Sequence, residues 1–296
     1  MAGPSFDQRE GHIWYNGEYV DWKDAKLHVL SHGLHYASSV FEGVRAYGGK
    51  IFKLEEHTER LYKSAELLGF EIPYSQQELN RIQIEILEKE GLTDAYLRPV
   101  AWRGSEMMGI SAQENKINVA IAAWEWPSYF SPEDRLKGLR LKTAEWRRPD
   151  PRTIPCVAKA AGLYMICTLS KHKVEKEGYQ DAMMLDFEGY VAEATGANIF
   201  FIKDGAIHTP TPDCFLNGIT RQTVVDLAKR RGIKVIERKI RPEELGDFEE
   251  CFLTGTAVEV TPVSAIDNYS FTPGTITKTL MDDYTAEVTP TAAAAE

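Results

Sequence analysis

The segment IPCVAKAAGLYMIC, residues 154–167, decides how the rest of the chain is interpreted, because it places one lysine in apolar surroundings. Between Thr153 and Ser170 the only charged side chain is Lys159, in a chain of which 26% of the residues are charged. An isolated lysine usually lays its stem on apolar surface and keeps its ammonium in water. A lysine removed from water can instead lose its proton, attack a carbonyl carbon and form a Schiff base. The segment alone leaves both interpretations open.

The composition is that of a globular protein, with 43% hydrophobic residues in a chain of 296, long enough for two domains or one large one. The formal net charge of -10 disfavours nucleic acid and anionic membranes as partners, since both attract positive surface. The four cysteines lack the spacing of a disulfide framework or a zinc site, which predicts thiols in a cytoplasmic protein. No signal peptide or membrane-spanning run is indicated. Any bound anion must therefore be held by a local arrangement of donors.

Alternating apolar residues and glycine turns predict an α+β unit in the first part of the chain. The turns are expected at Asn16–Gly17 and Gly48–Gly49. Each predicted helix carries an apolar stripe and ends at a glycine. The expected elements are hairpins over residues 12–22 and 40–54, helices over 55–70 and 75–91, and strands over 95–102 and 116–124.

A change in composition predicts a domain boundary, because the residues around 127–138 combine prolines, polar residues and aromatics without periodicity. Short strands that turn at Glu188–Gly189 and Asp204–Gly205 are expected after it. The expected elements are a helix over 162–177, a strand meander over 181–210, a helix over 220–232, and strands over 234–240 and 250–255. The expected domains are a small α+β domain over 1–126, a loop over 127–138, a larger domain with Lys159 over 139–288, and a disordered tail over 289–296.

Two segments could bind an anion through main-chain amides. In LNGITRQTVVDLAKRRG, residues 216–232, Thr220 lies at the start of an amphipathic helix. Thr220 is either an ordinary N-cap or, with Ile219, the donor of free amides to a phosphate at the positive end of the helix dipole. The segment TGTAVE, residues 254–259, is either a turn or a second anion-binding nest.

Glu193 in YVAEATGAN ends a predicted buried strand, where an unpaired carboxylate is costly. It is either exposed at the strand end or paired with a buried cation such as a protonated pyridine nitrogen. His28, His32 and His35 have the spacing of metal ligands on a helix, but Gly33 interrupts that helix and no further ligand completes a set. We expect no metal site. Dinucleotide, nucleoside triphosphate and α/β-hydrolase motifs are absent.

Seven motifs in order along nearly the whole chain resemble the fold-type IV pyridoxal-phosphate enzymes, specifically the branched-chain amino acid aminotransferases. They are HGLHY..SVFEG, EEHTERL, AYLRP, TIP..AKAAGLY, YVAEATGANIF, L.GITR and TGTA.E. The resemblance implies an α+β fold with a small α+β domain, a larger pseudo-barrel β domain with helices, and a cofactor between them. It also implies a cytoplasmic enzyme that transaminates leucine, isoleucine and valine with 2-oxoglutarate in a ping-pong cycle.

The resemblance implies a role for each residue of a pyridoxal 5'-phosphate site. Lys159 is expected to bind the cofactor as a Schiff base and afterwards to move a proton between substrate and cofactor. Glu193 is expected to keep the pyridine nitrogen protonated, and Tyr164 to bond the phenolic oxygen. Arg60 and main-chain amides are expected to hold the phosphate. The remaining implied cofactor residues are Leu216, Gly218, Ile219, Thr220, Gly255 and Thr256.

The implied substrate site is mostly apolar. The substrate α-carboxylate is expected near Tyr96 and the amides of Thr256 and Ala257, and Arg98 is expected to take the side-chain carboxylate of glutamate. One methylene in an apolar pocket is worth only ~1–3 kcal/mol, so broad selectivity is expected. The other implied substrate residues are Tyr36, Phe41, Gly43, Ile110, Trp126 and Tyr129. Some of them belong to a neighbouring subunit in the family, which implies a homodimer at least.

The sequence departs from the family pattern at two places, and these keep other functions open. Asn217 stands where the family usually has proline, and Arg103–Gly104 resembles the pair found in D-amino acid aminotransferases. One alternative is therefore a D-amino acid or (R)-amine transaminase of the same fold. The other is a non-catalytic protein that binds a phosphorylated metabolite, with Lys159 only structural.

Overall fold

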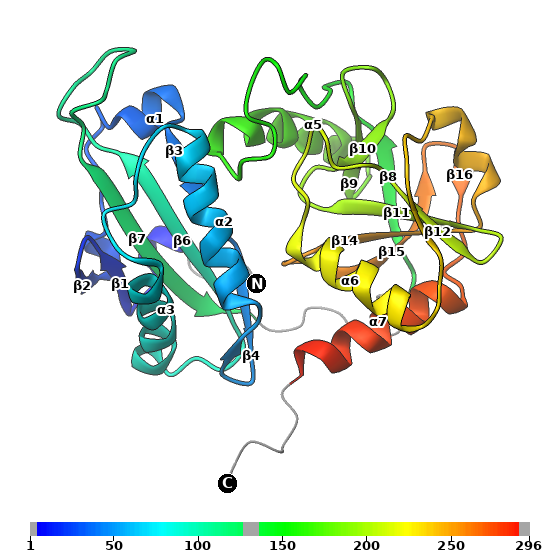
Figure 1. The fold of residues 1–296 in the computed structure, drawn as a ribbon, viewed down its shortest axis with the longest axis horizontal. Coiled ribbons are helices and arrows are strands. Elements are labelled where there is room, and N and C mark those ends of the chain that lie inside the picture. The colour runs from blue at the N-terminus through cyan, green and yellow to red at the C-terminus, as the bar shows by residue number, and fades with distance from the viewer. Residues whose placement is uncertain (1–4, 127–135, 290–296) are drawn as a thin grey trace, which may run out of the picture. The chain divides into compact units, whose positions relative to one another are not determined.

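The computed structural model describes residues 5–126 and 136–289, and within them the chain forms two compact units (Figure 1). Unit 1 contains residues 5–126 and 158–162, and unit 2 contains residues 136–157 and 163–289. Most of the expected loop over 127–138, including Tyr129, and nearly all of the expected tail lie outside the described residues. No described helix combines the length and the apolar character needed to cross a bilayer.

Unit 1 is built on one antiparallel sheet. Its strands are β1 (His12–Tyr15), β2 (Glu18–Asp21), β3 (Ser39–Phe41), β4 (Val44–Tyr47), β5 (Lys50–Ile51), β6 (Ala95–Arg103) and β7 (Ile117–Glu125). Its helices are α1 (His32–Tyr36), α2 (Leu54–Leu67) and α3 (Gln76–Glu90). The strand order is β2-β1-β7-β6-β4-β5, with β3 also paired to β6, and α2 and α3 lie against the sheet (Figure 1). Both predicted hairpins and both long helices of this unit are confirmed.

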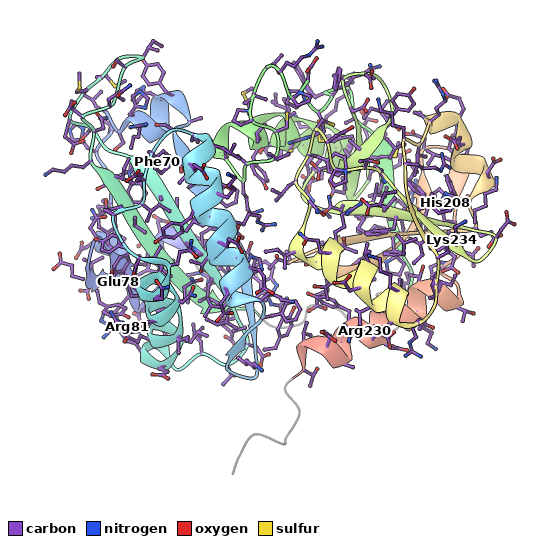
Figure 2. The ribbon with its side chains drawn as sticks, viewed as in Figure 1. Phe70, Glu78, Arg81, His208, Arg230 and Lys234 are labelled. Atoms are coloured by element: carbon purple, nitrogen blue, oxygen red, sulfur yellow. The ribbon has the colours of Figure 1, made fainter. Side chains whose placement is uncertain are left out.

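The ends of α3 show why the local sequence specifies this helix. Ser75 caps its N-terminus by accepting a hydrogen bond from the Glu78 amide at 3.2 Å. Glu78 lies in the first turn of α3, and Arg81 lies three residues further along the helix (Figure 2). Gly91 ends the helix with φ +64°, a left-handed conformation that glycine adopts without a steric penalty.

Glu42 and Gly43 separate β3 from β4, although both strands pair with β6. The Glu42 amide donates to the Pro99 carbonyl at 2.8 Å, and Pro99 has no N–H with which to return that bond. A Cβ atom at position 43 would lie 2.0 Å from the Tyr96 hydroxyl. Any residue other than glycine would therefore push the Tyr96 side chain out of its place.

Unit 2 is a mixed sheet closed into a barrel. Its strands are β8 (Leu139–Thr143), β9 (Asp181–Leu185), β10 (Val191–Ala194), β11 (Asn198–Lys203), β12 (Ala206–Thr209), β13 (Val235–Glu237), β14 (Glu250–Gly255), β15 (Glu259–Ile266) and β16 (Tyr269–Ser270). Its helices are α5 (Met165–Lys176), α6 (Ile219–Arg230) and α7 (Thr275–Val288). The strands β10-β9-β8-β15-β14-β11 are neighbours in that order, and β10 also pairs with β11, so these strands form a closed ring. The predicted α+β fold with a pseudo-barrel is confirmed.

Some elements of unit 2 differ from the expectation. A short 3-10 helix over Ala161–Tyr164 precedes α5, so the regular helix starts at Met165 and not at residue 162. Strand β13 is shorter than the expected strand over 234–240. Helix α7 had no counterpart in the sequence-based prediction, because its 14 residues include four threonines, which are weak helix formers.

The segment around Lys159 packs with unit 1, whereas the expected larger domain of residues 139–288 included it. The Lys159 amide donates to Ser64 Oγ at 2.9 Å, and the Phe41 amide donates to the Lys159 carbonyl at 3.1 Å. Val40 and Ala160 form an isolated antiparallel bridge beside them. These main-chain bonds, which sequence composition does not reveal, explain the difference.

Phe201 is fully buried in the barrel core, with its ring 4.9 Å from that of Phe248. We predict that Phe201→Ala lowers the free energy of unfolding by about 3–5 kcal/mol, because it removes buried apolar surface and leaves a cavity. Phe187→Ala is the matched control, since Phe187 is 39% exposed, and its effect should stay within about 0.5 kcal/mol. Urea unfolding followed by circular dichroism measures both, and equal effects would contradict the assigned core.

Candidate active site

In unit 1, Lys159 lies in a cluster of predicted site residues. Its main chain is held from both sides by Ser64 and Phe41, and its side chain is half-buried. The Lys159 Nζ atom lies 5.1 Å from the centre of the Phe41 ring. The amine is thus placed at a fixed point beside an aromatic face.

Arg98 and Tyr96 extend this cluster. Arg98 Nη2 donates to the Tyr96 hydroxyl at 3.2 Å, and the guanidinium carbon lies 4.9 Å from the centre of the Phe41 ring. The Tyr96 ring lies 5.2 Å from that of Trp126. Arg98 Nε is buried and has no hydrogen-bond partner among the described residues. Unit 1 therefore brings together six predicted site residues: Phe41, Gly43, Tyr96, Arg98, Trp126 and Lys159.

Arg60 is held by a buried carboxylate that the sequence did not single out. Its Nε and Nη2 atoms donate to the two oxygens of Glu42 at 2.7 and 2.8 Å. His57 Nδ1 lies 2.7 Å from the same carboxylate. Burial alone would raise the pKa of Glu42, but the charge of Arg60 and the hydrogen bonds from both partners hold it well below its usual value of 4.5. Glu42 therefore stays ionised and fixes the Arg60 side chain.

His57 donates to Glu42 as a neutral imidazole. Burial lowers the pKa of His57 from its usual value of 6.5, and the hydrogen bond and charge of Glu42 oppose this shift without cancelling it. A neutral ring carries one N–H, and a carboxylate can only accept, so that N–H is at Nδ1.

In unit 2, Glu193 is buried and paired, which excludes the exposed alternative. It is only 8% exposed, and its Oε1 atom lies 3.3 Å from Arg148 Nε. Burial would lower the pKa of Arg148, but the negative charge of Glu193 raises it above its usual value. Arg148 therefore stays charged beside the Glu193 carboxyl group. Sequence analysis missed Arg148, because nothing in the loop RRPDPRTIP indicates which arginine is buried. Tyr164 is partly buried and packs against an apolar cluster of unit 2 that includes Cys167 and Met184.

The N-terminus of α6 presents free amides. Gly218, and not Thr220, occupies the N-cap position, which excludes the alternative in which Thr220 is an ordinary N-cap. No hydrogen bond of the Ile219 or Thr220 amide is found among the described residues. These donors point from the positive end of a 12-residue helix, where anions bind favourably. Asn217 stands where the family usually has proline. Its Oδ1 atom accepts a hydrogen bond from Arg221 Nη1 at 3.0 Å, so the turn is held in place although the proline is missing.

The segment TGTAVE forms the turn between β14 and β15. Thr256 is half-buried and Ala257 is exposed, and their amides make no backbone hydrogen bond within the described chain. A Cβ atom on Gly255 would lie 3.3 Å from the Gly196 carbonyl, so this turn lies beside the β10–β11 hairpin that carries Glu193. The predicted residues that unit 2 carries are Tyr164, Glu193, Leu216, Gly218, Ile219, Thr220, Gly255, Thr256 and Ala257.

Two predicted substrate residues of unit 1 are not part of the Lys159 cluster. Tyr36 is 43% exposed and stacks on the His32 ring, and Ile110 is 87% exposed. His32 bonds Ser38 and the Gly109 carbonyl and so serves the fold of this region. Among the described residues no group of three or more potential ligands has the arrangement of a metal site.

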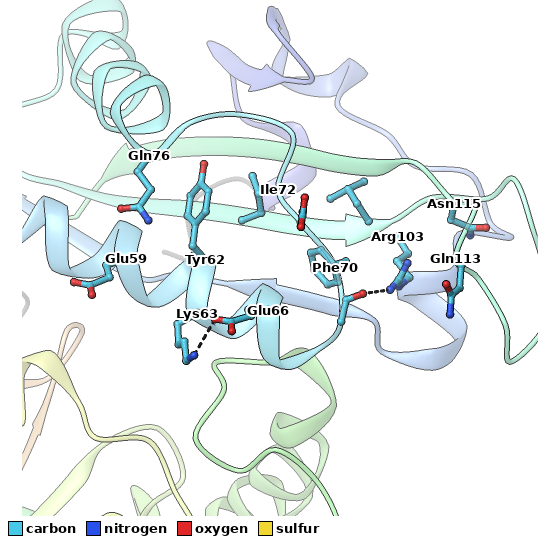
Figure 3. A pocket seen from close by; sticks show the side chains of 13 residues that line it. Glu59, Tyr62, Lys63, Glu66, Phe70, Ile72, Gln76, Arg103, Gln113 and Asn115 are labelled. Carbon is cyan, nitrogen blue, oxygen red and sulfur yellow. Dashed lines mark hydrogen bonds and ion pairs between the residues drawn. The ribbon is translucent and has the colours of Figure 1, made fainter.

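A separate groove of about 920 Å³ on unit 1 contains none of the predicted site residues (Figure 3). Arg103 lines it and donates to the carbonyls of Ala112 and Gly69 at 2.9 and 2.7 Å. Both bonds tie loops of unit 1 together. Arg103 therefore has a structural use that is independent of substrate choice.

Comparison with known proteins identifies relatives along most of the chain. The model of the amino-transferase class IV family matches residues 39–266. A branched-chain-amino-acid aminotransferase of Pseudomonas aeruginosa is 45% identical over 267 residues, covering 89% of this chain and 87% of that protein. The T.th. branched-chain amino acid aminotransferase with pyridoxamine 5'-phosphate superposes with a TM-score of 0.92, at 40% identity and 95% coverage of both chains. Its complex with N-(5'-phosphopyridoxyl)-L-glutamate gives a TM-score of 0.90, at the same identity and coverage.

The buried His57–Glu42 pair predicts that stability falls on acidification. The unfolded chain binds a proton at His57 near pH 6.5, whereas the folded chain binds it only at lower pH, so stability is lost as the pH falls below 6.5. A second loss follows below pH 4.5, where the unfolded chain protonates Glu42. We predict that His57→Gln reduces the loss between pH 7 and pH 5.

Urea unfolding at a series of pH values measures this effect, with His172→Gln as the control at an exposed histidine. The stability of His172→Gln should change with pH in the same way as that of the unsubstituted protein. If His57→Gln and the control lose stability equally between pH 7 and pH 5, His57 does not titrate as described.

Proposed function

The chain belongs to the amino-transferase class IV family, and from this premise we propose that it transfers amino groups between branched-chain L-amino acids and 2-oxoglutarate. The observation that carries the proposal is the position of Lys159, whose amine lies in one cluster with Phe41, Tyr96 and Arg98. The name of the Pseudomonas relative supports the branched-chain substrate. The glutamate adduct of the T.th. enzyme supports glutamate as the second amino acid.

The described residues fit pyridoxal 5'-phosphate. Glu193 is a buried carboxyl group paired with the charged Arg148, and a buried carboxylate is the partner that a protonated pyridine nitrogen requires. The free amides of Ile219 and Thr220 suit the phosphate, and we propose that Arg60 and Thr256 contribute to the same group. When bound, the cofactor supplies a carbonyl carbon for the amino group and a ring that takes up electrons from the substrate α-carbon.

Lys159 is the proposed catalytic residue. Its Nζ would hold the cofactor and, when free, would hold and move the proton of the substrate α-carbon. Such a proton carrier must be held at a fixed point, and the bonds of its main chain to Ser64 and Phe41 provide this. The Phe41 ring, whose centre lies 5.1 Å from this amine, places an apolar face beside it.

The unit 1 cluster explains how one site can accept two kinds of side chain. The rings of Phe41 and Trp126 offer apolar surface to a branched side chain. Arg98 lies against Phe41 and has a buried Nε without a partner in the described chain, so it can receive the side-chain carboxylate of glutamate. We propose that Tyr96, with the amides of Thr256 and Ala257, binds the α-carboxylate shared by both substrates. Alternate use of one site gives a ping-pong cycle.

We further propose a homodimer located in the cytoplasm. Tyr36 and Ile110 are exposed although the resemblance assigns them to a substrate site, which fits a role in the site of a second copy. Other exposed apolar residues in the same segments are Leu27, Val29, Leu30, Leu34, Met107 and Met108. All four cysteines are buried free thiols, as expected in a reducing compartment.

Lys159→Ala tests the catalytic assignment. We predict a loss of the rate with L-leucine and 2-oxoglutarate of about 10²–10⁴-fold or more, because the proton carrier is removed. Lys63→Ala is the control, since the Lys63 side chain is 61% exposed and pairs with Glu66 on the same helix, and it should keep full activity. Steady-state assays with L-leucine, D-alanine and (R)-1-phenylethylamine complete the test. A preference for either of the last two substrates would overturn the branched-chain assignment.

Arg98→Gln tests whether Arg98 serves the acidic substrate and not the apolar one. We predict that kcat/KM for 2-oxoglutarate falls by about 10–100-fold, because a charge-assisted bond to the substrate is lost. The half-reaction with L-leucine should change several-fold at most, since Tyr96 remains in place. Stopped-flow measurement of the two half-reactions separates them, and equal losses in both would show that Arg98 does not select the acidic substrate.

A further inference from the structure

Asn198 contacts two segments of the proposed cofactor site at once. We propose that Asn198 is a positioning residue, which fixes the loop leading into α6 relative to the Glu193 carboxylate. It thereby sets the spacing between the group that faces the pyridine nitrogen and the amides that bind the phosphate. This inference rests on the proposed function and concerns how unit 2 shapes that site.

Three side-chain contacts of Asn198 reach proposed cofactor residues. Its Nδ2 atom donates to the Leu216 carbonyl at 2.9 Å and lies 3.4 Å from Glu193 Oε2. Its Oδ1 atom accepts from the Gly218 amide at 3.1 Å. The residue is only 5% exposed. One planar amide thus connects the carboxylate to both ends of the turn before α6.

The chemistry of the partners fixes the orientation of this amide. A backbone N–H such as that of Gly218 can only donate, so the side-chain atom facing it is the oxygen. The Leu216 carbonyl and the Glu193 carboxylate can only accept, so the atom between them is the nitrogen. Aspartate could keep the bond from Gly218, but it has no N–H for Leu216 and would place a second carboxylate beside Glu193.

The approach of the loop to Asn198 is close enough to require glycine. A Cβ atom at position 218 would lie 2.3 Å from Asn198 Oδ1. The backbone of Gly218 has φ -60°, which any residue can adopt, so contact and not conformation makes glycine necessary. The Gly218 amide is used by Asn198, whereas the next two amides, of Ile219 and Thr220, have no partner in the described residues. Because Asn198 takes up the Gly218 amide, the free donors of α6 begin at Ile219.

The backbone of Asn198 is itself held at the point where the barrel closes. It pairs across β10–β11 with Glu193 and across β11–β14 with Thr254. The residue is the first of β11, and the turn that contains Thr256 follows directly after Thr254. A positioning side chain on a rigid element transmits its geometry better than one on a loop.

The test compares binding of pyridoxal 5'-phosphate with binding of pyridoxal, which lacks the phosphate. Both dissociation constants are measured by visible absorbance on the full-length chain and its variants. We expect Asn198→Ala to weaken binding of pyridoxal 5'-phosphate by about tenfold or more, because the Gly218 amide and the Leu216 carbonyl lose their hydrogen-bond partner and the loop moves. Binding of pyridoxal should weaken much less, so the ratio of the two constants changes. Asn198→Asp should lose at least as much as Asn198→Ala.

Thr209→Val is the matched control. Thr209 is 1% exposed, and its hydroxyl donates to the carbonyl of Ile199, the next residue on β11, so this variant also removes one buried hydrogen bond from the same strand. The melting temperatures of the variants without cofactor should fall similarly. The control should keep the original ratio of binding constants.

The outcomes separate the two proposals. If the original chain binds pyridoxal 5'-phosphate and Asn198→Ala keeps the same ratio as Thr209→Val, Asn198 is merely structural and this inference is overturned. Normal binding by Asn198→Asp would overturn it as well. If the original chain does not bind pyridoxal 5'-phosphate at all, the proposed function itself fails, and this inference fails with it.

Discussion

The buried carboxylate of Glu42 is the interaction on which the site in unit 1 depends. A charge without water must be balanced, and Arg60 of α2 balances it, while His57 of the same helix donates a hydrogen bond to it. The requirement fixes α2 against Glu42, which directly follows Phe41 at the end of β3. Ser64, on the same face of α2 as Arg60, and Phe41 then hold the main chain of Lys159. The position of the proposed catalytic amine thus follows from a charge that cannot be left unpaired.

The anion site that we propose in unit 2 lies in a chain with a net charge of -10. Closure of the barrel at β10–β11 brings the hairpin with Glu193 beside the turn after β14. The free amides of α6 begin at a loop that Asn198 holds in place. Main-chain donors need no excess of basic side chains, so a strongly acidic protein can still bind a phosphate.

Much of the fold could be predicted because local signals specify it. The glycine turns at Asn16–Gly17 and Gly48–Gly49 and the glycine that ends α3 fix their elements without distant contacts. The missed features depend on partners far away in sequence. Arg148 is one of several arginines in its loop until the barrel places it against Glu193. Lys159 was expected in the larger domain, since its bonds to Ser64 and Phe41 are invisible in a linear pattern. The apolar surroundings of Lys159 are local, so they could single out this lysine, but only the family resemblance implied its role.

Borohydride reduction of the protein loaded with pyridoxal 5'-phosphate, followed by peptide mapping, tests the central claim most directly. Reduction makes the bond between cofactor and lysine permanent, so the modified residue can be identified by mass spectrometry. The structure predicts one modified peptide, the one that contains Lys159. Modification of a different lysine, or of none, would contradict the assignment of Lys159 and with it the proposed reaction.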